Sequence, residues 1–97
     1  MPDQTWALLT PPNLGAIAVI QLPARALSKL TNRTQWDIGT LHLVEIPDID
    51  EAVAVQVNET IAHIMPHGGK HILHKLKERL AALGIEQTNT PIFIEAQ

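Results

Sequence analysis

Residues 60–83 constrain the fold more than any other part of the chain, because they predict a strand, a tight turn and a long helix in succession. The apolar run 61–65 is typical of a buried strand. Residues 66–69 interrupt this strand, since proline has no N–H for a sheet ladder and glycine adopts turn conformations readily. The helix that follows must therefore bury its apolar face against a sheet that contains the strand.

The expected helix spans residues 70–83 and is amphipathic. Its apolar residues recur at the 3.6-residue spacing of one helical stripe. They are Ile72, Leu73, Leu76, Leu80 and Leu83. Charged side chains occupy most of the opposite face, and Gly84 stands where a C′ glycine commonly ends a helix. The remaining apolar segments are expected to pack against this helix.

The composition bounds the class of protein. With 97 residues, of which 45% are hydrophobic, residues 1–97 are expected to form a single domain. The absence of cysteine excludes disulfides, thiolate zinc ligands and thiol catalysis. The net charge of −3 argues against direct nucleic-acid binding. The chain has neither an 18-residue apolar run nor a signal-peptide pattern, so we expect no membrane contact and a cytoplasmic location.

Other segments complete an α+β pattern. Strands are predicted at residues 5–9, 16–22, 41–46 and 52–57, and a last apolar piece at 92–94. The first two should pair antiparallel across the proline-rich turn 10–15. Pro23 suits a first helical residue before a short helix at 24–30, with Leu27 and Leu30 facing inward. The order β-β-α-β-β-β-α-β predicts a mixed or antiparallel sheet with two helices packed on it.

Two motifs carry a resemblance to a known family. The first is TPP at residues 10–12 followed by GAIAVI at 15–20, and the second is HGG at 67–69 before the long helix. In this order and spacing they resemble the N-terminal domain of the TrmE/MnmE family of tRNA-modification GTPases. The resemblance covers nearly the whole chain. It implies an α+β fold like the folate-binding domain of the glycine-cleavage T-protein, a homodimer, and formyl-tetrahydrofolate bound near the dimer interface.

The enzymes of that family contain parts that this chain lacks. They also carry a helical domain, a GTPase domain and a C-terminal cysteine motif, and they modify a wobble uridine of tRNA together with a flavoprotein. Here the closest approach to a phosphate-binding loop is Gly69-Lys70, with Ile64 at the first glycine position and His71 at the hydroxyl position. We therefore expect no GTPase activity, and we expect that the chain is not an enzyme.

The ligand residues implied by the resemblance are altered. Gln21 stands where the family has an arginine, and His63 stands where it has a glutamate. The lysine that the family places after this region has no counterpart in the sequence. With Gly15 of the hairpin turn, Gln21 and His63 are the residues expected to form a degenerate folate site. The leading hypothesis is a non-enzymatic homodimerisation or interaction module, with a protein of the TrmE/MnmE type as a further partner. The alternative is a binder of a tetrahydrofolate derivative linked to wobble-uridine modification.

The turn at His67, Gly68 and Gly69 has two interpretations. Free N–H groups and the helix dipole at a helix start suit an anion. The favoured interpretation is a tight strand-to-helix turn in which glycine has a conformational role. With His63, His71 and His74, His67 also has the spacing of helical metal ligands, but we favour solvated or capping histidines and no metal site.

Three further features have a structural and a functional interpretation. The basic residues of 70–79 are interpreted as an exposed helix face rather than as a surface for an acidic partner. Asp48, Asp50 and Glu51 are expected to be solvated in a turn rather than paired for catalysis. Trp6 is expected in the core, whereas Trp36, in the polar loop 31–39, would mark a partner surface if it were exposed.

Overall fold

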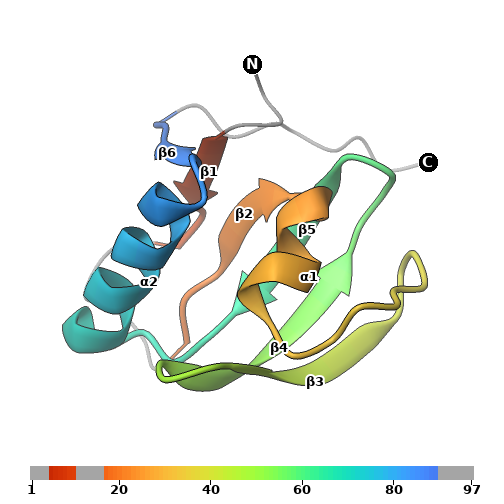
Figure 1. Cartoon of the computed structure of the whole chain (residues 1–97), viewed down its shortest axis with the longest axis horizontal. Helices are drawn as coiled ribbons and strands as arrows, with labels where there is room; N and C mark the ends of the chain where they lie inside the picture. Colours follow the sequence, from red (N-terminus) through yellow and green to blue (C-terminus); the bar gives the residue numbers. More distant parts are fainter. Residues whose placement is uncertain (1–4, 11–16, 90–97) are drawn as a thin grey trace.

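A computed structural model describes residues 5–10 and 17–89 as a six-stranded sheet with its helices on one face (Figure 1). The strands are β1 (Thr5–Leu8), β2 (Ile20–Pro23), β3 (Leu41–Ile46), β4 (Asp50–Gln56), β5 (Ile61–Met65) and β6 (Glu86–Gln87). The helices are the 3₁₀ turn η2 (Ala24–Ala26), α1 (Leu27–Leu30) and α2 (Lys70–Ala82).

The strand order across the sheet is β3-β4-β5-β2-β1-β6. The neighbours pair antiparallel except for β1 and β6, which are parallel. The predicted antiparallel pairing of the first two strands is confirmed, with Ala7 opposite Gln21 and Leu8 opposite Ile20. This mixed sheet with two helices packed on it confirms the predicted α+β class.

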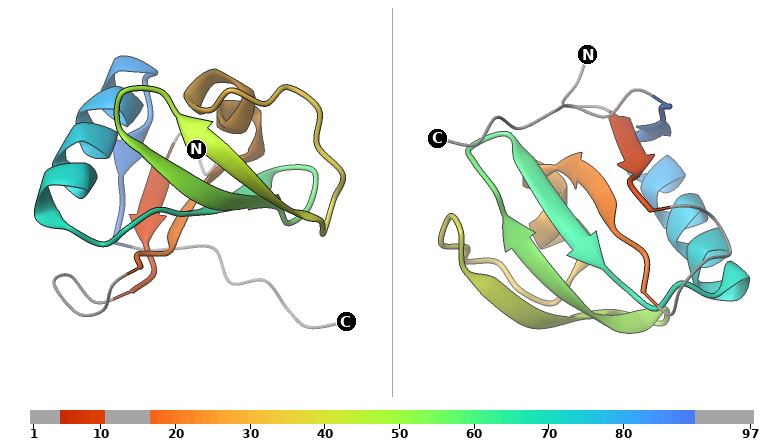
Figure 2. Two further views of the ribbon diagram at one scale, coloured as in Figure 1. Left: turned by 90° about the horizontal axis from the view of Figure 1, so that it is seen from below. Right: turned by 180° about the vertical axis from the view of Figure 1, so that it is seen from behind.

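The core lies between the sheet and the helices. Strand alternation directs Ile20, Leu22 and Ile64 to this side, where each is almost fully buried. Leu27 and Leu30 close the core from α1, and the stripe of α2 contributes Leu76 and Leu80. Trp6 is buried in the same cluster, as predicted. Figure 2 (left) shows α1 and α2 on the same side of the sheet.

The C-terminal end of α2 is a Schellman motif. Gly84 has φ +80°, a left-handed conformation that glycine adopts without a Cβ penalty. The Gly84 N–H donates to the Ala81 carbonyl over 3.0 Å, and the Ile85 N–H donates to the Leu80 carbonyl over 2.9 Å. Ile85 then enters the core beside Leu80. The predicted C′ role of Gly84 is confirmed.

Some element boundaries differ from the sequence-based expectation. Pro23 is not the first helical residue: it ends β2 opposite Ile61, with φ −63° and ψ 137°. Both conformations share the φ that proline fixes, so the sequence could not separate them. β4 begins at Asp50 rather than at residue 52, because a tight turn with Asp48 at φ 66° follows β3 directly.

The structure contains a strand, β6, that the sequence did not predict. β6 pairs with Thr5 and Trp6 in register, and the Thr88 N–H donates to the Trp6 carbonyl over 2.8 Å. The two-residue strand has a polar sequence, so backbone pairing rather than an apolar pattern defines it. The strand predicted at residues 92–94, and the turn at 11–15, lie outside the described residues.

Candidate functional site

The structure brings together two of the three residues of the predicted ligand site. Gln21 on β2 and His63 on β5 are register partners, and their Nε2 atoms lie 3.3 Å apart. Both side chains point to the sheet face away from the helices, because their strand neighbours Leu22 and Ile64 point into the core. The third residue, Gly15, lies outside the described residues.

The Gln21–His63 pair is uncharged. Partial burial lowers the pKa of His63 below its ordinary value of 6.5, because burial disfavours the imidazolium. In the observed orientation the Gln21 amide N–H donates to Nε2 of His63, which requires that this ring nitrogen carry no proton. The pair thus consists of uncharged polar groups, with Gln21 only 6% exposed, and it has neither the carboxylate nor the cation of the family's folate site.

An apolar surface extends across the same face toward the sheet edge. We call it the outer-face patch. It consists of Leu41 and Leu43 on β3, Val53 and Val55 on β4, and Met65 on β5. Leu41 is 63% exposed and Leu43 is 69% exposed. Two large aliphatic side chains exposed at neighbouring same-face positions are the kind of surface that a partner covers.

The edge strand β3 is partly protected beside this patch. The Glu45 N–H donates to Oδ1 of Asn32 over 3.0 Å, and the Glu45 carbonyl accepts the Asn32 N–H over 3.0 Å. Strand alternation turns the backbone groups of Leu43 and Leu41 to the same open side. There a polar groove of about 360 Å³ lies between Leu43 and residues 32–35. Residues 32–35 therefore flank this end of β3, and the exposed leucine side chains rather than the strand edge form the accessible surface.

The HGG turn is fixed by a carboxylate from another strand. Oδ2 of Asp50 accepts the backbone N–H of His67 over 2.9 Å and lies 2.9 Å from its Nδ1. Burial raises the pKa of Asp50, but the hydrogen bonds from His67 outweigh it and leave the pKa below 3.8. The expectation that Asp50 is solvated is therefore wrong: its side chain is 13% exposed.

The same contact removes one N–H group from the anion site, which was the less favoured interpretation of this turn. The His67 N–H is already bonded to the Asp50 carboxylate, so it is not open to an external anion. The conformational role expected for Gly69 is not found, because this N-cap residue has φ −64° and a Cβ built on it would meet no atom within 4 Å. Sequence reasoning missed the Asp50 contact because it joins positions 17 residues apart.

His63, His67 and His74 each contact a different residue. His63 faces Gln21, His67 contacts Asp50, and His74 lies 3.3 Å from Glu78 one helical turn onward. Within residues 5–10 and 17–89, no group of three or more His, Cys, Asp or Glu side chains has a metal-binding arrangement.

Trp36 is not the exposed residue that would mark a partner surface. It is half-buried against the core, and its ring meets His42 edge-on at 5.7 Å between centroids. The Arg33 guanidinium lies 5.7 Å from the same ring, within the range of a cation–π contact. The ring therefore holds the loop 31–40 against β3.

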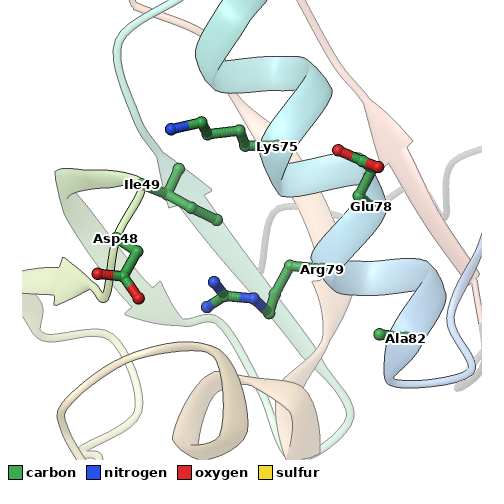
Figure 3. Close-up of a pocket in the computed structure, with 6 residues that line it drawn as sticks. All are labelled: Asp48, Ile49, Lys75, Glu78, Arg79 and Ala82. Carbon is green, nitrogen blue, oxygen red and sulfur yellow. The ribbon is translucent and has the colours of Figure 1, made fainter.

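A charged cleft of about 370 Å³ separates α2 from the β3–β4 turn (Figure 3). Lys75 and Arg79 extend from the helix toward Asp48 and Ile49 on the turn. Nη1 of Arg79 donates to the Pro47 carbonyl over 3.2 Å. Because both signs of charge line the cleft and Arg79 is bonded to the turn, this arrangement connects the helix to the sheet edge rather than selecting an anion.

In comparisons with known proteins, no family model matches the chain and no curated protein matches it. In the described part of the structure, no helix is both long enough and apolar enough to span a membrane.

Proposed function

We propose that this chain is a degenerate TrmE N-domain-like protein that acts as a non-enzymatic homodimerisation module. The observation that supports this proposal best is the outer-face patch with its two exposed leucines on an edge strand. Burying these side chains in a partner would contribute up to about 1.5–3 kcal/mol each. The occupant is a second copy of the chain.

The outer-face patch suits a two-fold contact. In such a dimer both subunits use the same surface, so each contact that Leu43 makes with the partner occurs twice. Packing of the two outer-face patches against each other would bury the exposed leucines of both copies. The same surface would admit a protein of the TrmE/MnmE type that carries an equivalent patch.

The proposal is tested by sedimentation velocity between 1 and 100 micromolar protein. The native chain should be a dimer at the upper end of this range, and Leu43→Glu should shift it to a monomer by placing a charge in an apolar interface. Ala81→Glu adds the same charge on the exposed helix side and should leave the dimer intact. A monodisperse native monomer at 100 micromolar would overturn the proposal, as would equal dissociation by the two variants.

An interaction with a TrmE/MnmE-type protein is tested separately. Differently tagged copies of this chain and a full-length protein of that family are mixed and purified through one tag. Co-purification that Leu43→Glu abolishes would support the shared surface. Failure to co-purify would restrict the proposal to self-association.

The second candidate function is binding of a tetrahydrofolate derivative, favoured by the direct Gln21–His63 contact. A pterin offers N–H donors and carbonyl acceptors that an amide and a neutral imidazole can pair with. Calorimetric titration with formyl-tetrahydrofolate and tetrahydrofolate tests this, with Gln21→Arg restoring the family's cation. Micromolar binding by the native chain would support a rebuilt site. Absence of heat with both proteins would exclude the candidate.

A further inference from the structure

A groove of about 330 Å³ lies between α2 and the strands β1 and β6, away from the outer-face patch. We call it the β1–α2 groove. Its apolar lining consists of Trp6 and Leu8 on β1 and Leu73 on α2. Trp6 is only 7% exposed, and Leu8 and Leu73 pack against the core cluster. The floor of the groove is thus a fixed part of the core.

The rim of the groove is basic. Lys70, His74 and Lys77 line it from α2 at spacings of four and three residues, which places them on one side of the helix. Neither lysine has an ion-pair partner among the described residues, and no described carboxylate lines the groove. Lys70 is also the first residue of α2, so the positive end of the helix dipole adds to its charge.

We propose that the β1–α2 groove binds a small amphipathic acid, meaning a carboxylate carried on an alkyl chain or an aromatic ring. The apolar body would cover Trp6 and Leu73, and the carboxylate would reach the two lysines at the rim. Charge complementarity selects the acid over a neutral or cationic molecule of the same shape. The volume of the groove is at the lower end of the range for ligand sites, so we expect a small ligand. This inference does not depend on dimerisation through the outer-face patch.

The groove can be tested with three eight-carbon probes that differ only in the head group: octanoate, octanol and octylamine. Each is titrated below its micelle concentration into uniformly ¹⁵N-labelled chain. A parallel titration follows the emission of Trp6 in a Trp36→Phe variant, which leaves one tryptophan. Octanoate should give saturable shifts in β1, β6 and the first two turns of α2, together with a change in Trp6 emission. Octanol should bind several-fold more weakly, and octylamine should not saturate.

Matched lysine variants separate the groove from general surface charge. Lys70→Gln and Lys77→Gln should each weaken octanoate binding about twofold to fivefold, as expected for exposed charge pairs. Lys75→Gln lies on the same helix but lines the charged cleft, so it should leave the affinity unchanged. These exposed substitutions leave the core untouched.

Four results would overturn the proposal. They are the absence of saturable shifts with octanoate, equal affinity for octanol or octylamine, shifts confined to the outer-face patch, and an effect of Lys75→Gln as large as that of Lys70→Gln. Because the readouts are local to β1 and α2, none of these results depends on whether the chain is a dimer.

Discussion

At the scale of single residues, one carboxylate organises the turn before the long helix. Asp50 accepts the His67 N–H and contacts its imidazole, although the sequence predicts the two residues in separate polar turns. α2 itself begins without a side-chain cap on its N-cap residue, Gly69. The chain is held two residues earlier, at His67, by Asp50 on the neighbouring strand β4.

Asp50→Asn should therefore destabilise the fold at neutral pH by about 1–2 kcal/mol, because a charged acceptor is replaced by a neutral one. The folded-state pKa of Asp50 is lowered, so its stabilisation is present above about pH 4 and is lost as the pH falls below 3.8. Urea denaturation at pH 7 and at pH 3 measures the free energy of unfolding. The difference between native and variant should shrink at pH 3.

Glu51→Gln is the control for that measurement, because Glu51 is an exposed neighbour on the same strand. It should change the free energy of unfolding by less than about 0.5 kcal/mol. An equal loss of stability in both variants would show that strand charge, rather than the His67 contact, accounts for the effect.

At the scale of elements, the two ends of α2 are built differently. The C-terminal end follows a local rule, with Gly84 in the left-handed region and its hydrogen bonds inside seven residues. At the N-terminal end, the turn before the helix is held at His67 by the Asp50 side chain of β4. A helix whose N-terminus depends on tertiary contacts is stable only within the folded chain.

Gly84→Ala should cost about 1 kcal/mol, because a Cβ at φ +80° is strained although no atom lies within 4 Å of it. Gly84→Asn is the matched control and should cost less, since asparagine tolerates the left-handed conformation. Thermal unfolding followed by circular dichroism gives the order. A variant with alanine as stable as the native chain would contradict this assignment of the C-cap.

At the scale of the whole molecule, the sheet has two different faces. One is closed by α1 and α2 over a continuous core, and the other carries the Gln21–His63 pair and the outer-face patch (Figures 1 and 2). A two-layer α+β domain needs only one covered face to fold. The second face is therefore where an interaction function would lie.

Leu80→Ala should lower the free energy of unfolding by about 2–5 kcal/mol, because Leu80 is fully buried and the substitution leaves a cavity. Leu43→Ala should change the stability of the monomer by less than about 0.5 kcal/mol, because Leu43 is exposed. Urea denaturation of both variants in dilute solution measures the difference. A large loss with Leu43→Ala in the monomer would contradict a purely surface role.

Several features could be predicted from the sequence because they depend on neighbours along the chain. The stripe of α2, the C′ glycine and the antiparallel pairing of β1 with β2 follow from periodicity and turn chemistry. The burial of Leu27 and Leu30 follows in the same way. The predicted conformation of Pro23 was wrong, because strand ends and helix starts share one value of φ.

The sequence by itself determined the α+β class and the amphipathic face of α2, since periodic burial is a local property. Tertiary structure decided what the local pattern cannot encode. It placed Asp50 against His67, set β6 in parallel with β1, and joined Trp6 and Leu73 in one groove. Each of these contacts joins residues far apart in the chain, and their proximity depends on how the strands are ordered in the sheet.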